Sequence, residues 1–151
     1  MTTIQEVNIL LINGPNLNLL GKREPSIYGD KDLEKIEQEL VDKAFKLDCN
    51  LECFQSNSES EIVDLIQQKS KNTDIIIINP GGYTHTSVAI RDAFLAVEVP
   101  FIEVHISNIF AREEFRKESY FSDIAVGIIS GFGFDGYNLA LDAAIIFSRK
   151  K

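Results

Sequence analysis

The strongest constraint on the fold is a run of four consecutive isoleucines at 75–78, between Asp74 and the Asn79-Pro80 pair. A continuous apolar run of this kind is typical of a central strand in a parallel sheet, where helices cover both faces. The apolar run at 7–12 predicts another buried strand. Because parallel strands need long crossover connections, helices are expected between the strands.

The rest of the chain alternates strand and helix patterns. Apolar residues recur at helical spacing in 32–47, and Ser58 with Glu61 has the form of a capping box before the next helix. A further helix, capped by Thr84, Thr86 or Ser87, is expected to end near Val97. The remaining predicted elements are strands at 51–55, 101–106 and 124–129 and helices at 109–117 and 136–148.

This alternation predicts an α/β fold, a flavodoxin-like three-layer sandwich around a five-stranded parallel sheet of order 2-1-3-4-5. The chain has 151 residues and a mass of 17.0 kDa, which fits a single catalytic domain at 1–151. Its hydrophobic content of 44% and charged content of 25% are those of an ordinary globular protein.

The charge and composition of the chain argue against several classes of binding partner. The net charge of −8 argues against nucleic acid and anionic membranes. No apolar stretch reaches the roughly 18 residues of a membrane span, and the first residues lack the pattern of a signal peptide, so we expect a cytoplasmic protein. Cys49 and Cys53 do not have a zinc-ligand spacing, and we interpret them as small, partly buried hydrophobic residues.

The connection after the first predicted strand, residues 13–30, is unusually long. A strand-to-helix connection needs roughly two to six residues, and longer loops in compact domains are usually lids or binding loops. Its leucines and isoleucine argue against a freely solvated loop. We therefore predict a lid at about 17–29, with Arg23 and Tyr28 as its reactive side chains.

Polar residues follow three of the predicted strands, at 13–28, 79–85 and 103–107. In sheets of this order a ligand binds beyond the carboxyl ends of the strands, where the strand order reverses. We expect the three clusters to converge at that edge. Glu103 and His105 fall on one face of a strand, where charged groups are costly unless paired or functional, so we predict a general acid held by a carboxylate.

The other motifs have ordinary structural interpretations beside functional ones. Asn79 to Ser87 could be a strand-end turn with a helix cap, although that leaves His85 unexplained. Arg112 and Arg116, four residues apart, predict either a solvated helix face or a local anion site. The G-x-G-x-x-G at 131–136 is interpreted as a tight turn with close helix packing, because the chain lacks the further strand of a dinucleotide site.

Together these motifs resemble the type II 3-dehydroquinate dehydratases of the shikimate pathway. The resemblance covers essentially the whole chain. It rests on N-G-P-N-L-N-L-L-G-x-R-E-P-x-x-Y-G at 13–29, N-P-G-G-Y-T-H-T-S-V-A-I-R-D at 79–92, E-V-H-I-S-N at 103–108 and R-x-x-F-R-x-x-S at 112–119.

The resemblance implies a lyase that needs no metal or cofactor and converts 3-dehydroquinate to 3-dehydroshikimate by anti elimination through an enolate. Tyr28 would be the base, with Arg23 and Arg112 stabilising its phenolate. Asn16 would hold the developing enolate charge, and His105, oriented by Glu103, would protonate the leaving hydroxyl. Family members form dodecamers, tetramers of trimers. The implied substrate-binding residues are Asn79, His85, Asp92 (from a neighbouring subunit), Ile106, Ser107 and Arg116.

A hypothesis from another class is a non-catalytic flavodoxin-like module that binds a small ligand. A flavin binder would need a Ser/Thr-rich phosphate loop after the first strand, and a phospho-acceptor receiver would need an acidic cluster at the same edge. The residues Asn13-Gly14-Pro15-Asn16 meet neither requirement.

Overall fold

The computed structural model describes residues 6–22 and 31–150 and contains a five-stranded parallel sheet. The strands are β1 (Val7–Asn13), β2 (Cys49–Gln55), β3 (Ile75–Asn79), β4 (Phe101–His105) and β5 (Gly127–Ser130). Their order is β2-β1-β3-β4-β5, and every pairing is parallel. The predicted fold class and strand order are therefore confirmed.

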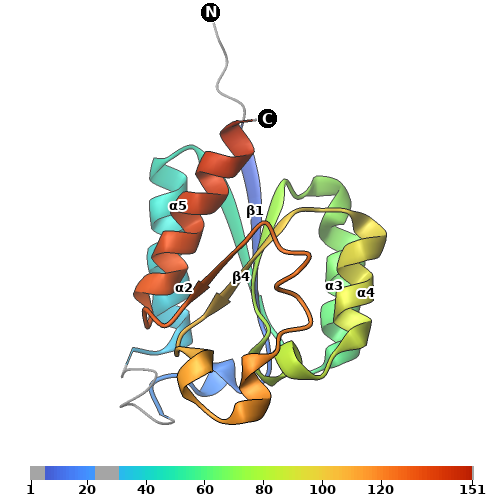
Figure 1. Cartoon of the computed structure of the whole chain (residues 1–151). Helices are drawn as coiled ribbons and strands as arrows, with labels where there is room; N and C mark the ends of the chain where they lie inside the picture. Colours follow the sequence, from blue (N-terminus) through green and yellow to red (C-terminus); the bar gives the residue numbers. More distant parts are fainter. Residues whose placement is uncertain (1–5, 23–30, 151) are drawn as a thin grey trace, which may run out of the picture.

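Two helices cover each face of the sheet (Figure 1). On one face lie α2 (Leu33–Lys46) and α5 (Asp135–Arg149), and on the other α3 (Glu59–Lys69) and α4 (Val88–Val97). The oxygens of Asp32, Ser58 and Ser87 accept hydrogen bonds from backbone N–H groups in the first turns of α2, α3 and α4. The predicted cap at Ser58 is confirmed, and of the three candidates Thr84, Thr86 and Ser87 it is Ser87 that caps α4.

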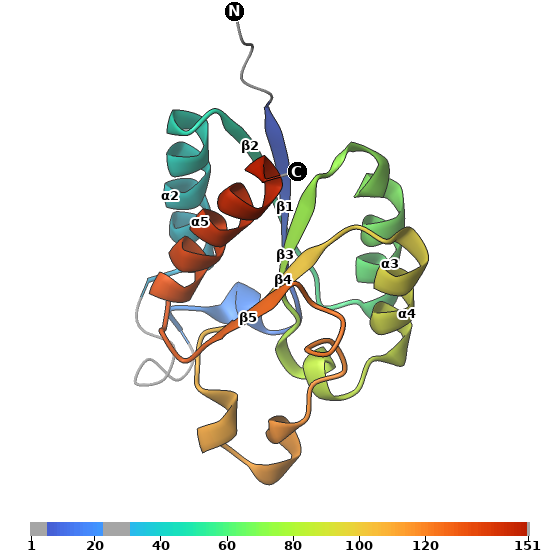
Figure 2. The ribbon, with the colours of Figure 1, turned by 45° about the horizontal axis from the view of Figure 1, so that its top comes forward.

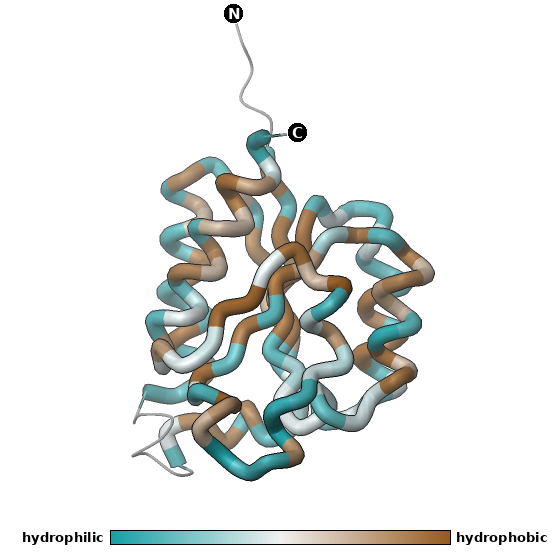
Figure 3. Tube along the Cα trace, in the orientation of Figure 1, coloured by the Kyte–Doolittle hydropathy of each residue, from teal (hydrophilic) through white to brown (hydrophobic). Residues whose placement is uncertain are grey.

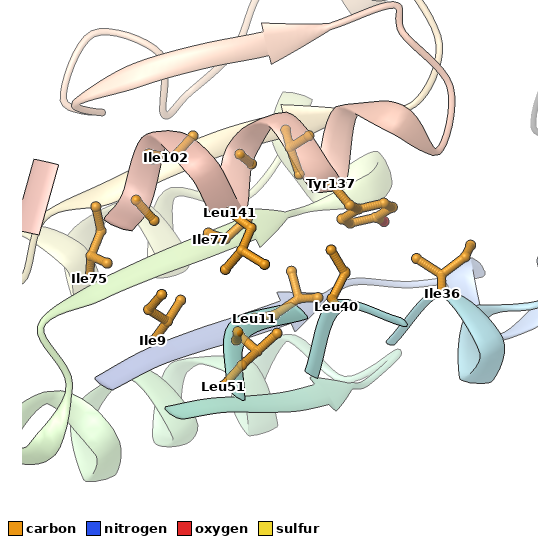
Figure 4. Close-up of a cluster of buried hydrophobic side chains, with 14 of the residues drawn as sticks. Ile9, Leu11, Ile36, Leu40, Leu51, Ile75, Ile77, Ile102, Tyr137 and Leu141 are labelled. Carbon is orange, nitrogen blue, oxygen red and sulfur yellow. The ribbon is translucent and has the colours of Figure 1, made fainter. Parts of the chain in front are cut away.

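The apolar side chains of the central strands alternate between two cores. Ile9, Leu11 and Ile77 pack under α2 and α5, together with Tyr137 of α5 (Figure 4). Their neighbours Leu10, Ile12 and Ile78 face α3 and α4. The isoleucine run of β3 is buried throughout because it lies in the middle of the sheet and feeds both cores. In Figure 3 much of the sheet in the middle of the molecule is brown, whereas brown and teal alternate along the helices.

Two predicted elements differ from the structure. The predicted helix at 109–117 is two 3-10 turns, η4 (Ile109–Ala111) and η5 (Glu114–Lys117), because Arg112 between them is extended. The predicted strand at 124–129 begins only at Gly127, since the N–H groups of Ile124 and Ala125 bond back to the carbonyl of Phe121. Apolar periodicity in short segments does not separate a turn from a helix or a strand.

The glycine-rich segment and the cysteines have structural roles. Gly131 and Gly133 have φ values of 97° and 64°, which suit a tight turn, and a Cβ on Gly136 would lie 3.4 Å from Val104 Cγ2. Cys49 is buried, Cys53 is partly buried, and both are free thiols. Within the part of the chain that the structure describes, no helix is both long and apolar enough to cross a membrane.

Candidate active site

A pocket opens where strands β1, β3 and β4 end, at the edge that contains the turns η1 (Leu17–Leu19), η3 (Gly81–His85), η4 and η5. Figure 2 shows these segments gathered below the carboxyl ends of the strands. The described parts of the three predicted polar clusters meet here. The lining residues are Pro15, Asn16, Leu17, Asn79, Gly81, Gly82, His85, His105, Ile106, Ser107, Ile109, Arg112 and Arg116.

The turn after β1 is fitted tightly against the turn after β3. Gly14 N–H donates to the carbonyl of Asn79 at 2.8 Å, and a Cβ at Gly14 would lie 2.4 Å from the carbonyl oxygen of Pro80. Only glycine allows this approach. Asn16 follows with φ 71°, and its N–H donates to Oδ1 of Asn57 at 3.0 Å. The tight fit puts Asn16 in the left-handed conformation at the pocket rim.

A buried hydrogen-bond chain links the ends of β1 and β3 to α5. Tyr137 donates its hydroxyl hydrogen to Oδ1 of Asn13 at 2.6 Å and accepts from Nδ2 of Asn79 at 2.9 Å. Gly81 N–H donates to Oδ1 of Asn79 at 3.2 Å, which fixes the orientation of that amide. One Nδ2 hydrogen of Asn79 therefore remains for a ligand. Burial raises the pKa of Tyr137, so its hydroxyl stays protonated and serves as a donor.

Glu103 and His105 form the predicted pair at the end of β4. The Nε2 atom of His105 lies 2.5 Å from Oε2 of Glu103, and the two residues are 5% and 0% exposed. Burial alone would raise the pKa of Glu103. The hydrogen bonds and positive charge of His105, with hydroxyl donors from Ser122 and Ser119, outweigh burial and hold that pKa below its ordinary value. Glu103 is therefore a carboxylate that receives Nε2–H and leaves Nδ1 of His105 for the pocket.

His85 lies at the end of η3 and is held differently. Its Nδ1 atom is 2.7 Å from the carbonyl oxygen of Glu118, which can only accept, so Nδ1 has the hydrogen. Burial, together with the nearby charges of His105 and Arg116, lowers the pKa of His85. A neutral ring then presents Nε2 as an acceptor, which suits a hydroxyl group of a ligand.

Two guanidinium groups complete the pocket. Arg112 donates to Oγ of Ser107 at 3.4 Å, and Arg116 donates through Nε to both carboxylate oxygens of Glu113 at 3.2 Å. The prediction that they share one helix face is wrong, because extended Arg112 separates the two turns. Both nevertheless line the pocket. They supply local positive charge for an anion in a protein of net charge −8.

The structure brings together most of the predicted site residues. Tyr28 and Arg23, and most of the predicted lid, lie outside the described residues. Asp92 is exposed on α4 and does not line the pocket. Sequence reasoning gave no role to Ser122, Asn57 or Tyr137. Serine, asparagine and tyrosine are too common for spacing to identify them, although Ser119 closes one of the quoted motifs. Among residues 6–22 and 31–150, no cluster of three or more His, Cys, Asp or Glu could hold a metal ion.

Comparison with known proteins identifies the family. The model for class II dehydroquinases matches residues 7–145. The chain belongs to the class II dehydroquinase family. A 3-dehydroquinate dehydratase of Haemophilus ducreyi is 63% identical over 138 residues, 91% of this chain and 96% of the relative. A 3-dehydroquinate dehydratase of Prochlorococcus marinus is 60% identical over 139 residues, which cover 92% of this chain and 95% of the relative.

Solved structures agree with this assignment. The type II dehydroquinase of Butyrivibrio crossotus superposes with a TM-score of 0.90 at 46% identity, covering 93% of this chain and 98% of that one. Membership of the dehydroquinase family confirms the predicted function, dehydration of 3-dehydroquinate by a hydro-lyase of the shikimate pathway. The alternative, a non-catalytic flavodoxin-like binding module, is not supported by these matches.

Proposed function

We propose that this pocket removes water from 3-dehydroquinate by an anti elimination through an enolate, with Tyr28 as the base and His105 as the acid. The observation that supports the proposal most directly is the Glu103–His105 pair. A fully buried carboxylate 2.5 Å from Nε2 stabilises the protonated ring, and Nδ1 then offers its proton to the pocket.

The proton transfers balance in two steps. In the first, the phenolate of Tyr28 takes the proton beside the ketone, and the electrons of that C–H bond form the enolate. In the second, the enolate expels the hydroxyl group on the neighbouring carbon. The proton on Nδ1 of His105 goes to the departing oxygen, which leaves as water. The new C=C bond is conjugated with the ketone in the product.

Ionisation of Tyr28 near neutral pH requires positive charge close to its hydroxyl group. An ordinary tyrosine has a pKa of about 10, and an opposite charge nearby usually lowers a pKa by about one to three. We propose that Arg23 and Arg112 act together on Tyr28, since one guanidinium is marginal for ionisation near neutral pH. Arg112 is half-buried at the pocket, where solvent screens its charge less than at the surface.

The remaining pocket residues would bind the substrate. The enolate oxygen charge would develop near Asn16, as in an oxyanion hole. The substrate carboxylate would bind the free Nδ2 hydrogen of Asn79 and the backbone N–H groups of Ile106 and Ser107. The ring hydroxyls would bind His85 and Arg116, in agreement with the acceptor that His85 presents and the donors of Arg116.

We further propose that the chain assembles into a dodecamer, a tetramer of trimers, in which Asp92 reaches the pocket of a neighbouring subunit. The exposure of Asp92 on α4 leaves it accessible for such a contact. Light scattering should give a mass of about twelve chains, and a stable monomer would overturn this proposal. We also propose a cytoplasmic location, as first expected, which cell fractionation would test.

The decisive experiment is an absorbance assay of the conjugated product after 3-dehydroquinate is added. The wild type should turn over between pH 6 and 9, and no turnover across that range would refute the assignment. Tyr28→Phe should abolish turnover and leave substrate binding, measured by calorimetry, largely intact. If the variant keeps more than about a tenth of the activity, Tyr28 is not the base, because a general base contributes about a hundredfold or more.

A further inference from the structure

The carboxylate of Glu103 has more partners than His105 alone. Ser122 donates its hydroxyl hydrogen to Oε1 at 2.6 Å, and Ser119 donates to Oε2 at 2.9 Å. Both serines lie on the segment 118–123, between η5 and β5, which we call the serine segment. With the bond from Nε2 of His105, both carboxylate oxygens have donors although the residue is 0% exposed.

The direction of these bonds is fixed by the backbone around them. Oγ of Ser119 accepts from the N–H groups of Phe121 at 3.0 Å and Ser122 at 3.2 Å. Its two acceptor sites are therefore used, and its only hydrogen must point to Glu103. Ser122 bonds through two groups: its N–H donates to Oγ of Ser119, and its hydroxyl donates to Oε1 of Glu103.

The serine segment is itself anchored to the helix and turn on the neighbouring side of the pocket. Tyr120 donates its N–H to the carbonyl of Thr84 at 2.8 Å. Arg91 of α4 donates to the carbonyl of Tyr120 at 2.9 Å and forms a two-point ion pair with Asp123, at 2.5 and 3.0 Å. The carbonyl of Glu118, at the start of the segment, holds His85. One short segment thus contacts His85 directly and is linked to His105 through the carboxylate of Glu103.

The electrostatics of the pocket explain why Glu103 needs several donors. The other titratable or charged groups lining the described part of the pocket are His85, Arg112 and Arg116. The two arginines bring positive charge to the pocket that His105 lines, and Glu103 is the carboxylate bonded to that ring. A buried carboxylate remains ionised only when it is well hydrogen-bonded.

We propose that Ser122, assisted by Ser119, is a positioning residue of this dehydratase that keeps Glu103 ionised and aimed at Nε2 of His105. Nδ1 of His105 is then directed at the leaving hydroxyl. Neither serine is among the described residues that line the pocket. The proposal rests on the role of His105 as the acid, given under the proposed function, and assigns the serine segment a part in the chemistry through Glu103.

The test compares Ser122→Ala with Ser122→Thr, which keeps the hydroxyl, and with Ser148→Ala. Ser148 lies on α5, and its buried Oγ has no hydrogen-bond partner among the described residues. Ser122→Ala should lower kcat by about tenfold, since a hydrogen bond to a charged group is lost, while KM stays within about twofold. Ser122→Thr should recover most of kcat, and Ser148→Ala should behave as wild type.

A spectroscopic measurement separates positioning from a general loss of structure. The chain has only two histidines, so the ring resonances of protein with 15N-labelled histidine can be assigned by comparison with His85→Asn. In the wild type, His105 should show a protonated Nε2 with a strongly deshielded hydrogen, as expected for the short bond to Glu103. In Ser122→Ala this resonance should move or broaden, and in Ser122→Thr it should remain.

The outcomes distinguish the two proposals. If Ser122→Ala keeps the wild-type kcat, or loses activity with the Nε2 resonance unchanged, the positioning role is wrong. The positioning role is also contradicted if Ser122→Thr keeps the wild-type circular dichroism but does not recover activity. If His105→Asn keeps full activity, the proposed acid is wrong instead. An inactive His105→Asn beside a wild-type Ser122→Ala refutes only the inference about the serines.

Discussion

The two histidines of the pocket come from different elements and are held by different kinds of contact. His105 is nearly buried, on the end of a strand, and bonds to an ionised side chain that is itself held by two hydroxyls. His85 is half-buried, on the turn η3, and bonds to a backbone carbonyl. The first arrangement places an ionised carboxylate beside the ring, and the second fixes the ring hydrogen on Nδ1.

In the proposed mechanism, this difference separates chemistry from binding within one pocket. A proton donor needs a carboxylate partner that is shielded from water, because solvent would weaken their interaction. A residue that only accepts a hydrogen bond from a substrate hydroxyl needs a fixed tautomer, and a backbone carbonyl is sufficient for that. The following predictions test the contrast between the two histidines and their surroundings.

The largest effect is expected for His105→Asn. Asparagine keeps a hydrogen-bonding side chain but has no proton to donate to the leaving group. We expect kcat to fall by about a hundredfold or more, the usual contribution of a general acid, with little change in substrate affinity. Steady-state assays with 3-dehydroquinate and calorimetric binding measure the two quantities. A variant with less than about a tenfold loss of kcat would contradict the assignment of His105 as the acid.

Asn57→Ala should have the next largest effect, because it removes a contact to the turn after β1. Asn57 accepts the N–H of Asn16, whose left-handed conformation costs free energy unless its surroundings enforce it. We expect kcat to fall by about tenfold because the amide of Asn16 is no longer held in place. Asn57→Asp retains the acceptor and is the matched control. Equal losses in both variants would show that the bond to Asn16 is not the cause.

The same substitution on the other histidine, His85→Asn, should affect binding more than chemistry. The loss of one hydrogen bond to a substrate hydroxyl corresponds to about 1 kcal/mol, or about a fivefold rise in KM. We expect kcat to change by less than about threefold. A larger effect on kcat than on KM would contradict the proposed difference between the two histidines.

The smallest effect is expected in the pH dependence of stability. The pKa of His85 is lowered from 6.5 on folding, so the unfolded chain takes up its proton first, and stability falls as the pH drops below about 6.5. The pKa of Glu103 is lowered from 4.5, so its contribution is present above that value and is lost as the pH falls through the lower folded-state pKa. Both groups destabilise the fold in acid, in different windows.

Urea denaturation between pH 3 and 8 would resolve the two windows. In His85→Asn the loss of stability that begins near pH 6.5 should shrink, and in Glu103→Gln the loss below pH 4.5 should shrink instead. An unchanged acid profile in Glu103→Gln would contradict the assignment of a lowered pKa to this buried carboxylate.

The sequence was sufficient for the sheet and for much of the site. The isoleucine run of β3 and the alternating helix patterns predict the parallel sheet and its order, because burial on both faces requires long apolar stretches. The topology then places the carboxyl ends of the strands together. It therefore assigns four residues to one edge of the sheet, namely Asn16, Asn79, His85 and His105. Charges two residues apart on a strand must share a face, which predicted the contact between Glu103 and His105.

Only the tertiary structure decided how those groups are held. Ser122 and Tyr137 lie 19 and 58 residues from the Glu103 and Asn79 side chains that they bond, and no local pattern encodes such distances. The break between η4 and η5 places Arg112 and Arg116 on separate turns, whereas their spacing suggested one helix. Periodicity records which residues are buried, but hydrogen bonds between distant segments form only after the packing of the whole chain has brought them together.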